Sequence, residues 1–506
     1  MAKIYSLDEL KIVIAKQKKD KKIIVHCHGV FDLLHIGHIK HFKTAKKLGD
    51  KLVVTITPDK YVNKGPGRPV FFQDLRSEAV ASIDCVDYVA INEAPTATYP
   101  IKKIKPNIYC KGKDYKNSKD DITGEIKNEI NELKKINGKI YFTEEATFSS
   151  SQLINESTNF YSKNKKKIIE KIKQKYNFQQ IKMLIDKFSE LKILLIGETI
   201  IDEYNFCEAI GKSGKDPILV LKDLKKERYF GGILNIASNL SEFSKKITIL
   251  SAIGEKKEFL KEIKKSLSKN IKTNFLNVKN TTTILKKRYV DNISKNKIIG
   301  VYNLNDEQLK KDDEEKFLKI LNKLTKQNDL VIVSDYGHGL ISKKAAKLIC
   351  KNSKFLALNA QINSSNIGFH TIRNYKNFNT LIINEKEIRH EMREKSLKLE
   401  TLMIKLSLEK NIKNLIVTRG NNGSIMYIKN KKKFYFVDAF AKNIIDKTGA
   451  GDTMLSLIGP CLKNNFDSNL TLLIGSLAAA QSVETIGNKH PVTKLKILKN
   501  LENILK

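Results

Sequence analysis

The sequence predicts an α/β protein with two consecutive domains, each built on a doubly wound parallel sheet. Short apolar runs alternate with amphipathic stretches over residues 23–145, and the same rhythm returns from residue 191 onward. This alternation is typical of βαβ units, whose strands pair in parallel. A Lys-rich stretch separates the two series, and 506 residues give each series enough chain to bury its own core. We therefore expect domains over residues 1–155 and 190–506, joined by a helical linker over 156–189.

The first domain is expected to begin with strands separated by helices. Residues 23–27 and 51–57 are short apolar runs rich in Ile and Val, which is typical of buried strands. Helices are expected from about residue 35 to 48 and from 75 to 83, and a further strand over 88–91. The first of these helices begins inside a histidine-rich segment.

The second domain repeats the strand and helix pattern with different motifs. A late apolar helix is expected from Ala450. The expected strands cover residues 191–197, 330–335, 355–359, 380–384 and 414–420. Because the two halves share no motif and no short-period repeat, they are not duplicates of one another.

The composition is that of a folded protein with an excess of positive charge. Hydrophobic residues make up 41% and aromatic residues 8% of the chain, which excludes wholesale disorder. The balance of 92 Lys+Arg against 55 Asp+Glu gives a net charge of +37, which raises the question of nucleic acid or membrane partners. Nearly all these basic residues are lysines spread along the chain. We therefore attribute the charge to a lysine-rich composition and expect neither nucleic acid nor membrane as a partner.

The cysteine pattern indicates a reducing compartment. The six cysteines lie tens of residues apart without a CxxC pair, so the sequence suggests neither a disulfide framework nor a cysteine zinc site. No segment approaches 18 uninterrupted apolar residues, and charges interrupt the apolar residues at the N-terminus. We expect a cytoplasmic protein without signal peptide or membrane span.

The first candidate site is the loop that joins the strand at residues 23–27 to the following helix. A loop that leaves a parallel strand and enters a helix offers free backbone N–H groups and the positive end of the helix dipole, which favour a phosphate. His35 and His38 would share one face of the first turn, where two imidazoles can donate hydrogen bonds to a polyphosphate. Gly37 leaves room for the ligand.

A metal site is the alternative for this segment, because five histidines cluster between residues 26 and 41. The HExxH spacing of zinc proteases is absent, and in the sequence no Cys or carboxylate completes a convincing set of ligands. A phosphate site is therefore the favoured interpretation.

The segment resembles the nucleotidyltransferases of the cytidylyltransferase-like superfamily, whose signature is GxFDxxHxGH. The resemblance covers nearly all of residues 23–155 and includes a KGKDY segment at 111–115 and a triple-serine turn at 149–151. It implies a Rossmann-like domain in which a phosphate oxygen attacks the α-phosphate of a nucleoside triphosphate and pyrophosphate leaves. The most similar subfamily is the adenylyltransferase half of the bifunctional enzymes that make ADP-heptose.

This resemblance implies a set of site residues in the first domain. His35, His38 and Lys111 would be catalytic, as groups that contact or neutralise the triphosphate. The nucleotide would be bound by Gly29, Phe31, Asp32, Gly37, Lys64, Arg76, Ser149, Ser150 and Ser151.

The second candidate site is the glycine-rich segment at residues 446–453, before the late apolar helix. Small residues there let backbone N–H groups surround a developing anion at the helix N-terminus. Asp452 can accept a proton from an attacking hydroxyl. Together these features are what direct phosphoryl transfer requires.

This segment resembles the signature of the ribokinase-like (PfkB) sugar kinases, and the similarity covers about residues 190–495. The resemblance implies a ribokinase-like fold with Asp452 as the catalytic base and Asn384 and Glu387 as the residues that organise Mg²⁺. It implies sugar binding by Asp202, Gly231, Gly232 and Asn235, and ATP binding by Thr418, Gly420, Gly423, Gly449, Ala450 and Gly451. Departures from the family pattern, such as Glu198 after Gly197, leave the identity of the sugar open.

Both resemblances together predict a bifunctional enzyme of nucleotide-sugar synthesis, similar to the heptose 7-phosphate kinase/heptose 1-phosphate adenylyltransferase family with the domain order reversed. The kinase would phosphorylate a sugar or sugar phosphate with ATP, and the transferase would couple a sugar 1-phosphate to a nucleotide. Mg²⁺ should serve both sites, and a homodimer is expected by resemblance. One alternative is a CTP-dependent transferase of a polyol or other sugar phosphate. Two others are a nucleic-acid-binding protein with a retired enzyme domain and a regulatory protein with one degenerate site.

Overall fold

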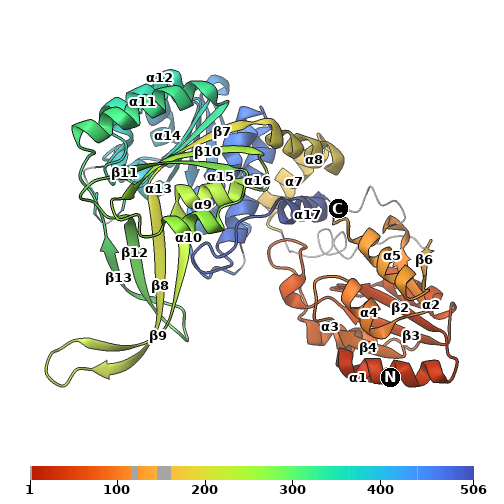
Figure 1. The fold of residues 1–506 in the computed structure, drawn as a ribbon. Coiled ribbons are helices and arrows are strands. Elements are labelled where there is room, and N and C mark those ends of the chain that lie inside the picture. Colours follow the sequence, from red (N-terminus) through yellow and green to blue (C-terminus); the bar gives the residue numbers. More distant parts are fainter. Residues whose placement is uncertain are drawn as a thin grey trace. The chain divides into compact units, whose positions relative to one another are not determined.

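The chain forms two compact units in a computed structural model. The structure describes residues 3–115, 123–144, 161–363, 365–367, 370–441 and 443–505. One unit comprises Met1–Lys166 with Leu498–Lys506, and the other comprises Lys167–Ile497. Both are sheets covered by helices (Figure 1). The prediction of two α/β domains is confirmed.

The first unit is built on a six-stranded parallel sheet. Its strand order is β1-β4-β3-β2-β5-β6. The strands are β1 (Lys3–Tyr5), β2 (Ile24–Gly29), β3 (Lys51–Ile56), β4 (Tyr88–Ile91), β5 (Ile108–Gly112) and β6 (Lys139–Thr143). The helices are α1 (Leu7–Lys19), α2 (Ile36–Lys46), α3 (Gln73–Ala81), α4 (Thr98–Ile104) and α5 (Glu125–Lys135).

The strand order of this unit creates a crevice at its centre. From β2 the chain moves outward through β3 to β4, and then returns to the other side of β2 to form β5. The loops after β2 and β5 therefore leave the sheet in opposite directions, and such a switch point is where open parallel sheets bind ligands. The histidine-rich loop follows β2, so the topology puts it at this point.

A compact apolar core holds α2 and α3 against the sheet of the first unit. Val25, Val54 and Phe42 are fully buried in this core. The predicted helices at 35–48 and 75–83 correspond to α2 and α3, which begin and end within two residues of the expected positions. The alternation of apolar strands and amphipathic helices was sufficient to find these elements.

The second unit contains a nine-stranded sheet that is parallel from β11 to β17 and antiparallel from there to β19. The order is β11-β10-β7-β14-β15-β16-β17-β18-β19. The strands are β7 (Lys192–Gly197), β10 (Lys246–Gly254), β11 (Ile271–Val278), β14 (Leu330–Asp335), β15 (Leu356–Ala360), β16 (Thr380–Asn384), β17 (Asn414–Thr418), β18 (Ser424–Ile428) and β19 (Lys433–Val437).

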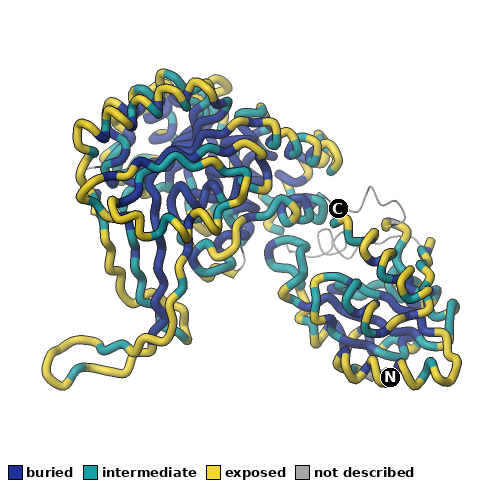
Figure 2. The backbone as a smooth tube through the Cα atoms, in the orientation of Figure 1, coloured by how far each residue is buried: buried dark blue, intermediate teal, exposed yellow. Residues whose placement is uncertain are grey.

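A smaller four-stranded sheet extends from the second unit. Its order is β13-β12-β8-β9, formed by β8 (Thr199–Lys212), β9 (Leu219–Gly232), β12 (Ile284–Asp291) and β13 (Lys297–Asn303). The sequence did not predict this sheet. β13 is exposed along its whole length and half of the residues of β9 are exposed in an unbroken or irregular order, so neither strand carries the alternation of a half-buried strand. Figure 2 shows the exposed far end of the β8–β9 hairpin.

The remaining helices follow in chain order, and two of them form a buried layer. Helices α15 and α16 pack against one another and are buried along most of their length. The helices are α7 (Lys163–Lys173), α8 (Phe178–Asp186), α9 (Ile233–Leu240), α10 (Leu260–Ser266), α11 (Lys311–Gln327), α12 (Lys343–Asn352), α13 (Glu385–Glu391), α14 (Leu399–Lys410), α15 (Ala450–Lys463), α16 (Ser468–Ser482) and α17 (Lys494–Leu505). Within the described part of the chain, no helix has the length and apolar character needed to span a membrane.

Replacing Phe42 by alanine should destabilise the first unit by about 3–5 kcal/mol, because the ring is fully buried and packs against Phe31 at 5.0 Å between centroids. Hydrogen exchange of peptides from β2 and β3 would report this loss locally in the full chain. Phe72→Ala is the matched control, since that ring is 72% exposed. Equal exchange in the two variants would contradict the assignment of Phe42 to the core.

Candidate functional site

The two signature histidines stand side by side where β2 passes into α2. His35 is the N-cap of α2, and its Nδ1 accepts a hydrogen bond from the backbone N–H of Gly37 at 3.1 Å. The His35 and His38 ring centroids are 4.0 Å apart, and Phe31 packs edge-on against His38. The start of α2 and the edge-on Phe31 ring thus hold both imidazoles where β2 passes into α2.

Both imidazoles are neutral near pH 7 and have an unused ring nitrogen. Burial lowers the pKa of His38 to about 3, and burial followed by the nearby Lys64 ammonium lowers the pKa of His35. Among the described residues, neither Nε2 of His35 nor Nδ1 of His38 has a hydrogen-bond partner. Because buried polar groups are normally paired, these two nitrogens fit a polar ligand.

Asp32 holds the loop that follows β3. Its carboxylate accepts hydrogen bonds from the backbone N–H groups of Val70 and Phe71 at 2.7 and 3.1 Å, and it lies 3.4 Å from the Arg68 guanidinium. The predicted residues Gly29 and Phe31 lie just before it, at the end of β2 and in the following loop. Asp32 therefore holds the loop after β3 from within the protein.

Arg76 lies inside the protein, whereas the sequence predicted it at the nucleotide. The side chain is 1% exposed, and its guanidinium donates to the carbonyls of Val30, Thr57 and Phe71. It also pairs with Asp59 at 2.6 Å. Four hydrogen bonds thus hold the guanidinium inside the protein.

Lys111 lies on a central strand of the sheet, and its ammonium already forms an ion pair with Glu129. It lies near the end of β5, and its ammonium contacts the buried carboxylate of Glu129 at 2.6 Å. The ammonium also lies 4.6 Å from the Tyr115 ring centroid. A triphosphate would therefore share Lys111 with Glu129. Ser149, Ser150 and Ser151 lie outside the described residues.

The second unit contains a cavity of about 1340 Å³. It is lined by residues from both sheets of this unit and by the first residues of α13 and α15. All but one of the residues predicted for the kinase site line it, namely Asp202, Gly231, Gly232, Asn384, Glu387, Thr418, Gly420, Gly423, Gly449, Ala450, Gly451 and Asp452. The exception is Asn235, which is buried on α9 and accepts a hydrogen bond from Asn239 at 3.3 Å.

Asp452 lies in the first turn of α15 and is held by two hydroxyls from the end of β14. Tyr336 donates to one carboxylate oxygen at 2.5 Å, and Ser334 donates to the other at 3.1 Å. Burial raises the pKa of Asp452 to about 6, against the opposing effect of both hydrogen bonds. The carboxylate is therefore mostly ionised at pH 7 and poised to accept a proton.

The turn before Asp452 requires glycine. Gly449 has a φ of 78°, and an added Cβ would come within 2.2 Å of the Asn488 side chain. Gly231 lets β9 approach Asp202 closely, because a Cβ there would lie 2.4 Å from the carboxylate. Both glycines thus let the backbone lie directly against side chains that line the cavity.

Two cations in the cavity, the buried Lys286 and the half-buried Arg288, were missed by the sequence analysis. Arg288 on β12 forms an ion pair with Asp202, and Lys286 lies with its ammonium 5.3 Å from the Tyr336 ring centroid. Burial lowers the pKa of Lys286. Their i, i+2 spacing on one strand puts both side chains on one face, and this spacing is the signal that could have found them.

Asn384 and Glu387 form a reciprocal capping pair at the start of α13. The Asn384 side chain accepts from the Glu387 N–H at 2.9 Å, and the Glu387 carboxylate accepts from the Asn384 N–H at 2.7 Å. Burial raises the pKa of Glu387 to about 7. Since both side chains line the cavity, they fix one carboxylate and one amide beside it.

A family description matches each of the two units. The description "pfkB family carbohydrate kinase" matches residues 190–495, which is more than half of the chain. This chain belongs to the pfkB family. The description "Cytidylyltransferase-like" matches residues 26–157. The pfkB domain is therefore the second of two, in the order that the sequence predicted.

Curated relatives match long segments of this chain. The "Bifunctional protein HldE" of Campylobacter jejuni (strain RM1221) is 27% identical over 301 residues, which are 59% of this chain and 62% of that protein. The protein of the same name from Aliarcobacter butzleri (strain RM4018) is 38% identical over 138 residues, which are 27% of this chain and 29% of that protein. The chain thus matches less than two thirds of the length of these relatives.

A solved structure supports the fold of the pfkB domain. A point mutant of phosphofructokinase-2 from Escherichia coli matches with a TM-score of 0.51 and 13% identity, over 62% of this chain and 100% of that one. At this identity the match shows the fold alone.

Replacing Arg76 by lysine should destabilise the first unit by about 3 kcal/mol, because lysine keeps the charge but cannot reach the four acceptors of the guanidinium. Limited proteolysis should then cleave the segment between residues 57 and 76 faster. Arg393→Lys, at an exposed position of the second unit, is the control. If Arg76→Lys left proteolysis unchanged and only weakened nucleotide binding, the structural role that we assign to Arg76 would be wrong.

Proposed function

We propose that this chain is a bifunctional enzyme of nucleotide-sugar synthesis. Residues 190–506 would phosphorylate a sugar phosphate similar to heptose 7-phosphate with ATP. Residues 1–155 would transfer a nucleotide to a sugar 1-phosphate and release pyrophosphate, giving a product similar to ADP-heptose, and residues 156–189 would link the two. The observation that carries this proposal is the cavity of the second unit, where the Asp452 carboxylate, a glycine turn and the cations Lys286 and Arg288 meet.

The kinase reaction follows from the order of groups around the cavity. Thr418, Gly420 and Gly423 would bind the nucleotide, and Asp202 would accept hydrogen bonds from the sugar. Asp452 would take the proton of the attacking hydroxyl as its oxygen bonds to the γ-phosphorus and the bond to ADP breaks. The N–H groups of Gly449, Ala450 and Gly451 would stabilise the charge that develops on the transferred phosphoryl group.

A Mg²⁺ ion fits beside Asn384 and Glu387. Carboxylate and amide oxygens are ligands that Mg²⁺ accepts, usually alongside substrate phosphates. Glu387 is buried with a raised pKa, so a nearby divalent cation would favour its charged form. Bound there, Mg²⁺ would neutralise the phosphate charge.

The transferase reaction would rely on positioning and hydrogen bonding. Neutral His35 and His38 can each donate one hydrogen bond to the triphosphate without the cost of burying a second charge. Lys64 and Lys111 would add positive charge. A sugar 1-phosphate oxygen would bond to the α-phosphorus while the bond to pyrophosphate breaks, so the enzyme needs no covalent intermediate. ATP is the proposed nucleotide, with CTP as the alternative.

Separate variants should remove the two activities separately. Asp452→Asn should lower the kinase rate at least about 10³-fold and leave pyrophosphate release unchanged, whereas His38→Ala should do the reverse. The assays are ADP formation and pyrophosphate release by the full chain with Mg²⁺, ATP or CTP and a panel of sugar phosphates. If pyrophosphate were released with CTP and not with ATP, the product would be a CDP-activated sugar or polyol in place of the proposed ADP-heptose-like product. Loss of both activities in either folded variant would contradict two independent sites.

The kinase rate should fall on the acid side of about pH 6, because Asp452 accepts a proton only when ionised and its pKa is about 6. Tyr336→Phe removes a hydrogen bond that lowers this pKa, so the acid limb should move to higher pH. The measurement is kcat against pH for both proteins. Pyrophosphate release serves as the control, since no limb from Asp452 should appear there. If the acid limb of the kcat profile stayed at the same pH in Tyr336→Phe, Asp452 would be excluded as the group that causes it.

A further inference from the structure

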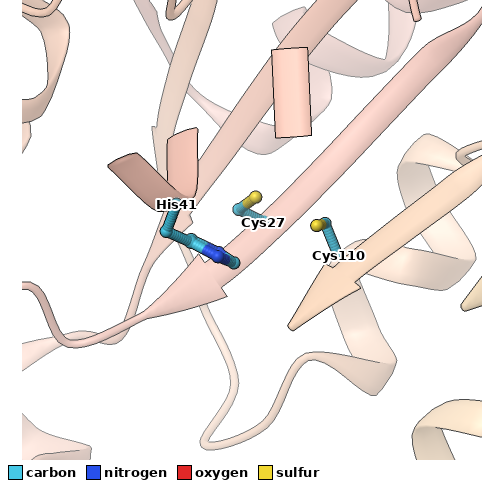
Figure 3. A group of neighbouring side chains, drawn as sticks. All are labelled: Cys27, His41 and Cys110. Carbon is cyan, nitrogen blue, oxygen red and sulfur yellow. The ribbon is translucent and has the colours of Figure 1, made fainter. Parts of the chain in front are cut away.

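Two cysteines and a histidine that are far apart in the sequence meet inside the first unit. Cys27 on β2 and Cys110 on β5 are register partners on neighbouring parallel strands, and His41 comes from α2 beside them (Figure 3). One ligand atom from each of the three residues lies within 4.8 Å of the other two. Neither the transferase reaction nor the kinase reaction uses this group.

The donor set is the one that soft divalent metals prefer. Zinc binds thiolate sulfur and imidazole nitrogen, most often in a tetrahedron with ligands from separate segments of the chain. Carboxylates, which would favour magnesium or calcium, are absent from the group. The three residues therefore select a thiophilic ion over a hard one.

The apolar surroundings favour a metal centre whose ion and ligands together carry no net charge. Cys27 is 0% exposed and Cys110 is 1% exposed, and both belong to the apolar core that includes Phe42 and Val54. An unpaired charge in such a core is costly. Two thiolates carry two negative charges and cancel the two positive charges of a zinc ion, so the loaded centre brings no net charge into the core.

The imidazole of His41 is oriented by a second partner. Its Nδ1 lies 2.9 Å from the hydroxyl of Thr143 at the end of β6, and that hydroxyl lies 3.5 Å from the Lys111 carbonyl. A hydrogen bond that fixes the ring orientation is usual for metal-binding histidines. His41 follows His38 by three residues on α2, so whatever holds His41 also holds the helix that carries the signature histidines.

We propose that Cys27, His41 and Cys110 bind one Zn²⁺ ion in the first unit. Binding converts two thiols to thiolates, and their two protons pass to solvent. The ion would tie α2 to β2 and β5 and so fix the helix that presents His35 and His38. It is a positioning centre rather than part of the reaction, and its presence does not depend on the proposed function.

The test is the zinc content of the full chain, purified under reducing conditions without chelator. We expect about one zinc per chain, and a content at least about tenfold lower in Cys27→Ser and in Cys110→Ser, since even the loss of an indirect partner changes metal affinity by that factor. Cys85→Ser is the matched control, because Cys85 packs against the same core but is not in the group. It should keep its zinc.

A second measurement needs no variant and so is independent of folding defects. Adding Co²⁺ to the zinc-free wild-type chain should produce a near-ultraviolet thiolate-to-cobalt absorption that stoichiometric Zn²⁺ abolishes. Absence of this band, zinc retained in both serine variants, or a Cys27–Cys110 disulfide in place of the metal would overturn the proposal. Because metal content is measured without substrate, none of these outcomes bears on the two proposed activities.

Discussion

Parallel strand pairing is the constraint on which both candidate sites depend. All pairs in the sheet of the first unit are parallel, as are those from β11 to β17 in the second. Parallel strands end at one edge, so loops that are remote in sequence meet there. His35 follows β2 and Lys111 lies near the end of β5. Ser334 is the residue before the last in β14, while Asn384 and Thr418 are the last residues of β16 and β17.

Burial sets the chemistry at those strand ends. Desolvation disfavours the charged form of every ionisable group that is buried. Asp452 and His38 differ in whether neighbouring groups offset this effect on their pKa. Hydroxyls from Tyr336 and Ser334 partly offset it at Asp452, so that carboxylate remains available as a base. Around His38 the neighbouring histidines and Lys64 add to the effect of desolvation, so that imidazole remains neutral. The same physical effect thus yields a base in one unit and a neutral hydrogen-bond donor in the other.

A departure from the kinase pattern has a structural use. Glu198, which stands where the family usually has aspartate, accepts hydrogen bonds from the backbone N–H groups of Tyr336 and His338 at 3.0 and 3.1 Å. Burial, followed by the nearby Asp335, raises the pKa of Glu198 to about 8. Glu198 thereby fixes the turn after β14 that directs the Tyr336 hydroxyl at Asp452. Glu198 therefore acts on Asp452 indirectly, through the backbone of Tyr336.

The sequence by itself determined the two α/β domains, and it pointed to many of the residues that line the cavity of the second unit. Hydrophobic periodicity and glycine-rich turns are local signals. Local signals could not find the β8–β9–β12–β13 sheet, whose exposed strands lack alternation. They also could not find the partners of Arg76 and Lys111, since Asp59 and Glu129 come close only when separate segments pack together. Only the tertiary structure decided that Arg76 is enclosed and that Cys27 meets Cys110. The order in which parallel strands pair is a property of the whole sheet, and no short stretch of sequence encodes it.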